Sequence, residues 1–174
     1  RQRQMCIRDR DKALALLQLN LTNTKRYITN IMKGEIAMVQ ILAGEKGEGK
    51  TKKLIAMANE AGKSANGSVV FVDDDNSRMY DLHYSVRFVD TPKFIMEDPQ
   101  VFRGFVCGIL SQNSDIEKIY IDGLNHIVDK VSDADFVKFI EELEKTSAEA
   151  ETDMIMIISR KQDLLPAEVQ KYLV

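Results

Sequence analysis

Residues 44–51 read Gly-Glu-Lys-Gly-Glu-Gly-Lys-Thr, which fits the G-x-x-x-x-G-K-[ST] pattern of a phosphate-binding loop without a mismatch. Such a loop holds a polyphosphate through successive backbone N–H groups. Glycine allows the chain to curl tightly enough for these groups to converge. The pattern also requires a strand before the loop and a helix after it. It therefore restricts the fold more than any other stretch of the chain.

The residue types in this motif predict particular contacts. Lys50 would place its ammonium against the β- and γ-phosphates, and Thr51 would offer its hydroxyl to a Mg²⁺ ion. The helix that begins here adds the positive end of its dipole. The residues predicted to bind nucleotide are Gly44, Glu45, Lys46, Gly47, Glu48, Gly49, Lys50, Thr51 and Lys52, with Lys50 also in a catalytic role.

The flanking sequence supplies the context that the motif requires. Residues 39–43 are apolar, short and rich in β-branched side chains, which predicts a buried strand. After the loop, apolar residues recur at spacings of three and four, which predicts one face of a helix; they are Leu54, Ile55, Met57, Ala58 and Ala61.

Composition limits the remaining possibilities. The chain has 174 residues, 44% of them hydrophobic, which suits one domain with a sizeable core. Its net charge of -3 does not indicate a nucleic-acid binder. Two cysteines, Cys6 and Cys107, form no disulfide framework, and no apolar run reaches the roughly 20 residues that span a bilayer. We therefore expect a cytoplasmic protein without a membrane span.

The first 37 residues differ from the rest. Residues 1–10 carry four arginines without periodicity and resemble translated adapter sequence, so we exclude them from the fold. Codons for residues 33–35 can form a ribosome-binding site ahead of Met38. We expect residues 1–37 to be a non-native or upstream-translated leader and residues 38–174 to form a single nucleotide-binding domain. The alternative is an amphipathic helix within residues 11–37.

Two further strands are predicted to end in carboxylates. Residues 68–72 read as a buried strand followed by Asp73, Asp74 and Asp75, a cluster that suits either a metal or phosphate site or a solvated acidic turn. Residues 116–121 form an apolar run that ends at Asp122. This is the form of a Walker B element, whose carboxylate reaches the Mg²⁺ that Thr51 also holds.

The other elements alternate between strand and helix. Residues 86–89 and 154–158 predict strands, and helices are predicted from Pro99 with Asp98 as N-cap, over residues 133–150, and over residues 166–173. This alternation predicts an α/β fold, a three-layer parallel sheet with helices on both faces. Its ligand would lie at the carboxyl ends of the strands.

The loop at residues 44–51, together with the strand that ends at Asp122, resembles the P-loop NTPases. The buried strand over residues 69–72 lies between the two motifs in sequence, as a strand does in their RecA-like, additional-strand branch. The chain from Met38 is also similar to small uncharacterised clostridial proteins labelled twitching motility protein PilT or ATP-binding protein. The resemblance implies bound ATP and Mg²⁺.

Hydrolysis requires a group that orients water and a positive charge for the transition state. RecA-like members take a carboxylate from a neighbouring strand end, which implies a matching position among Asp73, Asp74 and Asp75, with Asp74 and Asp75 as the catalytic candidates. Gly123 follows Asp122, so the glutamate often found there is missing. Arg160 and Lys161 are candidates for contact with the γ-phosphate, with a solvated basic turn as the alternative.

Three functions remain open at this stage. The first is a slow or partner-dependent ATPase, whose partner would be another protein or a further copy of this chain. The second is a regulatory module that binds ATP without hydrolysing it. The third is a GTP-binding protein, because residues 160–163 partly match the guanine-reading pattern [NT]-K-x-D. Met79, Tyr80, His83 and Tyr84 suit either an adenine contact or ordinary packing, and we favour packing.

Overall fold

The computed structural model describes residues 38–91 and 98–174. These belong to a compact unit, Met38–Val174. The leader predicted for residues 1–37 lies outside the described residues and stays a prediction. Within the described ranges, no helix is both long and apolar enough to cross a membrane.

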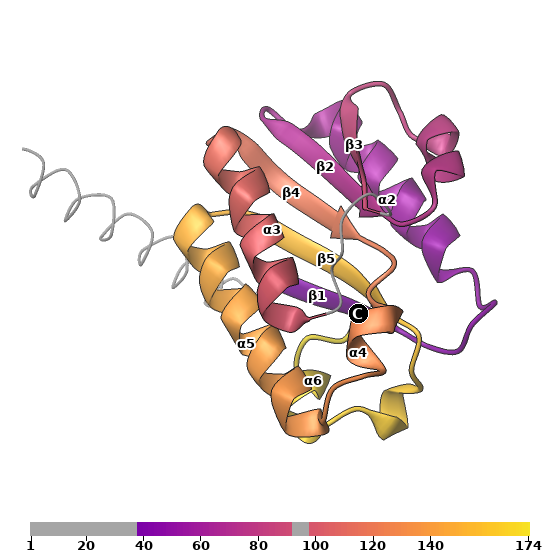
Figure 1. The fold of residues 1–174 in the computed structure, drawn as a ribbon. Helices are drawn as coiled ribbons and strands as arrows, with labels where there is room; N and C mark the ends of the chain where they lie inside the picture. Colours follow the sequence, from indigo (N-terminus) through magenta and orange to yellow (C-terminus); the bar gives the residue numbers. More distant parts are fainter. Residues whose placement is uncertain (1–37, 92–97) are drawn as a thin grey trace, which may run out of the picture. The chain divides into compact units, whose positions relative to one another are not determined.

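The domain is built on one parallel sheet. Its five strands are β1 (Val39–Ala43), β2 (Ser68–Asp73), β3 (Val86–Asp90), β4 (Ile116–Ile121) and β5 (Asp153–Ile158), in the order β1-β5-β4-β2-β3. β5 therefore separates the strand before the phosphate loop from the strand that ends at Asp122 (Figure 1). Tyr172 and Val174 extend the sheet beyond β1 through hydrogen bonds to Ile41.

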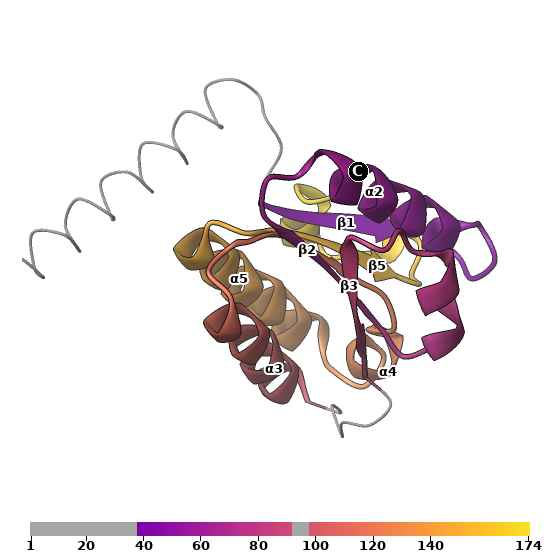
Figure 2. The ribbon, with the colours of Figure 1, turned by 90° about the horizontal axis from the view of Figure 1, so that it is seen from above.

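Helices cover both faces of the sheet, as predicted. α2 (Lys50–Ser64) lies on one face, and α3 (Pro99–Gln112) and α5 (Asp133–Ala150) lie on the other (Figure 2). Short elements complete the domain: η1 (Asn76–Asp81), α4 (Asn125–Val128), η2 (Gln162–Leu164) and α6 (Ala167–Gln170). The predicted α/β three-layer architecture is confirmed.

Alternation along the strands explains the two core layers, because successive side chains point to opposite faces of a sheet. In β1, Ile41 packs in the cluster formed with α3 and α5, whereas Leu42 packs against α2. The helices contribute residues at spacings of three and four, as in Phe136, Phe139, Ile140 and Leu143 of α5. Both faces of the central strands are therefore buried.

Local signals set the helix boundaries. The carboxylate of Asp98 accepts hydrogen bonds from Gln100 N and Val101 N, so the predicted N-cap of α3 is confirmed. Ser132 caps α5 in the same way through Asp135 N. One predicted boundary was wrong: the C-terminal helix predicted over residues 166–173 covers Ala167–Gln170, because the residues after it pair with β1.

Candidate functional site

The carboxyl ends of β1, β2, β4 and β5 meet at one edge of the sheet, and a cleft of about 870 Å³ opens there. Its walls come from the phosphate loop, the residues after β2, the residues after β4 and the end of β5. Parallel strands place their carboxyl ends on the same side, which explains why segments distant in sequence come together.

The phosphate loop turns sharply between β1 and α2. Gly47 and Gly49 have φ of 95° and 79°, which L side chains rarely adopt, and Gly49 is the N-cap of α2. Lys50 Nζ donates to the carbonyl oxygens of Gly44 (2.8 Å) and Glu45 (2.5 Å). The ammonium is thus held inside the curve of the loop.

The predicted nucleotide-binding residues divide into two groups. Those that line the cleft are Lys46, Gly47, Gly49, Lys50, Thr51 and Lys52. Gly44, Glu45 and Glu48 do not line it. Gly44 is buried, with the Glu48 carboxylate so close that a Cβ at this glycine would overlap it. Glu45 pairs with Lys161, at 3.2 Å between Oε1 and Nζ.

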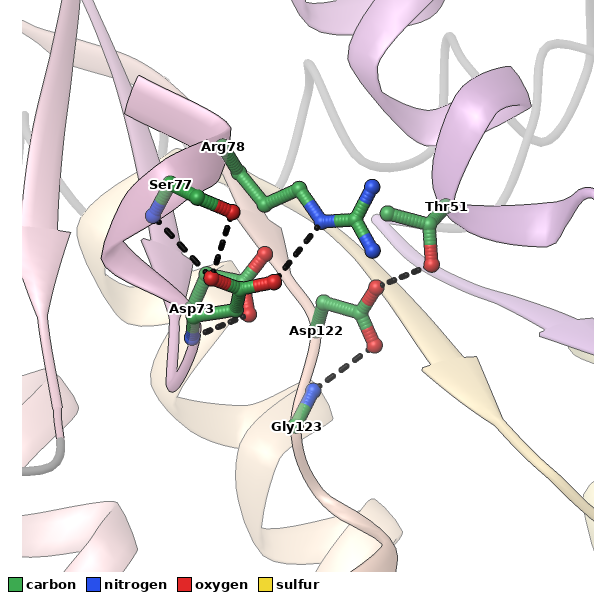
Figure 3. A network of polar contacts seen from close by, with 7 residues as sticks. Thr51, Asp73, Ser77, Arg78, Asp122 and Gly123 are labelled. Carbon is green, nitrogen blue, oxygen red and sulfur yellow. Dashed lines mark hydrogen bonds and ion pairs between the residues drawn. The ribbon is translucent and has the colours of Figure 1, made fainter. Parts of the chain in front are cut away.

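The structure brings the two predicted metal-ligating residues together. Thr51 Oγ1 donates to Asp122 Oδ2 at 2.7 Å, although the residues lie 71 positions apart in sequence (Figure 3). The other oxygen of Asp122 accepts from Gly123 N at 2.7 Å. A hydroxyl and a carboxylate are the hard oxygen donors that Mg²⁺ prefers, so the chemistry of this pair fits the ion. No cluster of three or more histidine, cysteine or acidic side chains suited to a metal occurs in residues 38–91 and 98–174.

The three aspartates after Val72 have three different environments. Asp73 still belongs to β2 and is only 2% exposed; its Oδ1 accepts from Asp75 N, and its Oδ2 has no hydrogen-bond partner in the described part of the chain. Burial raises the pKa of Asp73 to about 7, against the opposing Asp75 N–H, and the charges of Asp122 and Asp74 add to the rise.

Asp74 and Asp75 are exposed, but they differ in their contacts. The Asp74 carboxylate lies against Gly123, where a Cβ would approach its Cγ to 2.9 Å. The Asp75 carboxylate instead accepts from Ser77 N (3.0 Å) and Ser77 Oγ (2.6 Å), and it pairs with Arg78 Nε (3.3 Å). The hydrogen bonds from Ser77 and the nearby Arg78 charge lower the pKa of Asp75.

Arg160 and Lys161 do not line the cleft. Arg160 reaches Asp133 at 3.1 Å and the Val128 carbonyl at 3.3 Å, and it lies over the Phe136 ring. Its guanidinium thus packs against α4 and α5, so neither a γ-phosphate contact nor a solvated turn describes Arg160.

Sequence reasoning missed four polar residues that line the cleft, Arg78, Asn125, Asp129 and Ser159. Asn125 Oδ1 accepts from Ser159 N at 2.8 Å and so joins the start of α4 to the end of β5. An aspartate two positions before a serine can signal the turn that carries Arg78, but no local pattern marks Asn125.

The packing interpretation of the aromatic segment near η1 was wrong. Tyr80 is 84% exposed and Tyr84 is 94% exposed, and neither residue lines the cleft. The His83 ring lies 4.2 Å from the exposed Tyr84 ring between centroids, with the two rings tilted by 37°.

Comparison with known proteins supports the fold. No protein-family model matches the chain, and no curated protein matches it in sequence. Among solved structures, it is similar to a KaiC-like protein of the hyperthermophilic archaeon Pyrococcus horikoshii, with a TM-score of 0.56, 13% identity, and coverage of 80% of this chain and 70% of that chain. This likeness supports the fold: the five-stranded parallel sheet with its helices is the α/β fold that this KaiC-like protein also has.

Proposed function

We propose that this protein binds ATP together with Mg²⁺ in the cleft at the carboxyl edge of the sheet. The observation that carries the proposal is the 2.7 Å hydrogen bond between Thr51 and Asp122, which joins the two motifs across the sheet. In this proposal the backbone N–H groups of residues 44–50 and the Lys50 ammonium hold the phosphates. Thr51 and Asp122 would hold Mg²⁺, which supplies positive charge to the phosphate oxygens.

Slow hydrolysis is the activity we favour. Asp74 is exposed at the cleft and lies against Gly123, one residue after the proposed Mg²⁺ ligand Asp122. A carboxylate at this position can accept a proton from an attacking water. Asp75 is occupied by Ser77 and Arg78, so we assign it a positioning role.

A regulatory module that binds ATP without cleaving it is the second candidate. It is favoured by Gly123, which stands where a glutamate would otherwise assist Asp122. GTP is less well supported, because Asp163, the residue that would read guanine, does not line the cleft. The resemblance to proteins labelled PilT, a protein partner or homo-oligomer, and a cytoplasmic location stay predictions.

Calorimetric titration with ATP and GTP, with and without Mg²⁺, tests the binding proposal. We expect Mg²⁺-dependent ATP binding that Lys50→Ala weakens by about tenfold or more, since a charge-assisted contact to phosphate is lost. If Lys50→Ala binds ATP as tightly as the wild-type protein does, and does so independently of Mg²⁺, the binding proposal is contradicted.

Phosphate release then separates the two candidates. If the protein is an ATPase, Asp74→Asn should lower release by about a hundredfold while ATP affinity stays within about threefold. If the wild-type protein binds ATP but releases no phosphate above the Lys50→Ala background, the regulatory module is correct.

A further inference from the structure

Arg78 carries a positive charge into the cleft, although it lies outside the phosphate loop. It belongs to η1, which follows β2, and it lines the cleft. Figure 3 shows its guanidinium extending from η1 toward Thr51 and Asp122. Its side chain is 42% exposed, so a ligand in the cleft can reach it.

Asp75 holds this arginine in place. The same carboxylate caps η1 through Ser77 N and pairs with Arg78 Nε at 3.3 Å. Because the ion pair uses Nε, the two terminal nitrogens of Arg78 lie beyond it, on the side facing Thr51 (Figure 3). Two parallel N–H donors are the part of a guanidinium that binds phosphate oxygens in a bidentate manner.

The charges around the cleft show why a cation is needed there. Asp74 and Asp122 line the same cleft as Arg78, and their negative charges would repel a phosphate that has no cation beside it. The other lining cations among the described residues are Lys46, Lys50 and Lys52, all in the phosphate loop or the first turn of α2. Arg78 is therefore placed to balance these carboxylates.

We propose that Arg78 contacts the γ-phosphate of the nucleotide bound in its own chain and that Asp75 positions it for this contact. The inference rests on the proposed function, since it assigns a residue to the same site. Its consequence is selectivity: the site prefers a triphosphate to a diphosphate, because a diphosphate leaves the Arg78 guanidinium without its phosphate partner.

Calorimetric titration with ADP and with a non-hydrolysable ATP analogue, both with Mg²⁺, tests this. Arg78→Ala should lower the affinity for the ATP analogue by about tenfold to hundredfold and the affinity for ADP by less than about threefold. The affinity of Arg78→Lys for the analogue should lie between those of wild type and Arg78→Ala, because lysine keeps the charge but lacks the two parallel N–H donors of the guanidinium. Asp75→Asn keeps the cap acceptor but loses the ion pair, so it should also weaken only the analogue. Arg87→Ala, which removes an exposed arginine on β3, is the charge-matched control and should bind both like wild type.

Three results would overturn the inference. If Arg78→Ala binds the analogue as tightly as wild type, Arg78 does not contact the γ-phosphate. If it weakens the analogue and ADP equally, Arg78 only supports the fold, which thermal unfolding of the variant would show independently. If wild type binds neither ligand, the proposed function fails together with the inference, whereas the first two results leave it intact.

Discussion

Thr51 Oγ1 lies 2.7 Å from Asp122 Oδ2, so the first turn of α2 and the end of β4 are joined directly, although β5 separates β1 from β4 in the sheet. A hydroxyl that donates its hydrogen to a carboxylate keeps lone pairs on its oxygen, and a cation can bind to them. In the proposed site this pair would hold Mg²⁺ with little rearrangement.

This geometry predicts how ATP affinity depends on Mg²⁺. Asp122→Asn should abolish most of the increase in ATP affinity that Mg²⁺ causes, because one anionic oxygen donor is lost. ATP affinity in the presence of Mg²⁺ should therefore fall by about tenfold or more. Binding without Mg²⁺ should change little. Titrations across a series of Mg²⁺ concentrations measure this, with Thr51→Ser as the control that keeps the hydroxyl. An undiminished Mg²⁺ effect in Asp122→Asn would rule out Asp122 as a ligand.

Asp73 predicts a pH dependence of stability. Its pKa in the folded protein is about 7, above the value of 3.8 for an ordinary aspartate. Between about pH 4 and pH 7 the folded state therefore holds a proton on Asp73 that the unfolded state has released. The free energy of unfolding thus has its full contribution from Asp73 below about pH 4 and loses it as pH rises toward 7.

Asp73→Asn should remove this loss, since an amide stays neutral. We expect the variant to gain stability relative to wild type between pH 5 and pH 8 by about 1 to 3 kcal/mol. Urea denaturation of both proteins without nucleotide, at the two pH values, measures the change. A stability difference that is the same at both would show that Asp73 does not titrate in this range.

Much of this architecture could be predicted because the buried strands are apolar and short, and each ends at or just before a polar residue or a glycine. The strands before Gly44 and Asp122 are examples, and their parallel arrangement follows from the helices between them. The sequence does not reveal which strands are neighbours, so the position of β5 between β1 and β4 required the structure.

The different roles of Asp73, Asp74 and Asp75 could not be predicted, because identical side chains follow one another without a local pattern. Their environments differ because β2 pairs with β3 as far as Asp73 and no further. Asp73 is still paired with Asp90 of β3 and is buried, whereas Asp75 lies past the strand and caps η1. The contact of Arg160 with Phe136 likewise depends on where α5 packs, which the residues after β5 do not indicate.

Arg160 predicts a loss of stability without a loss of binding. Arg160→Ala removes the ion pair with Asp133 and the contact with the Phe136 ring, which should lower the free energy of unfolding by about 1 to 2 kcal/mol. ATP affinity should stay within about threefold of wild type, since Arg160 does not line the cleft. Denaturation and calorimetry on the same sample test both parts. A larger loss of affinity than of stability would return Arg160 to the phosphate site.

The phosphate loop itself predicts a contrast between two glycines. Gly49 has φ of 79°, so Gly49→Ala should cost about 1 to 2 kcal/mol of folding free energy and distort the loop enough to weaken ATP binding severely. Gly104 lies within α3, and a Cβ there would meet nothing within 4 Å. Gly104→Ala should therefore stabilise the protein by about 0.5 to 1 kcal/mol with unchanged binding. Thermal unfolding and ATP titration of both variants measure the contrast, and a Gly49→Ala protein that is stable and binds ATP normally would show that the positive φ is not required.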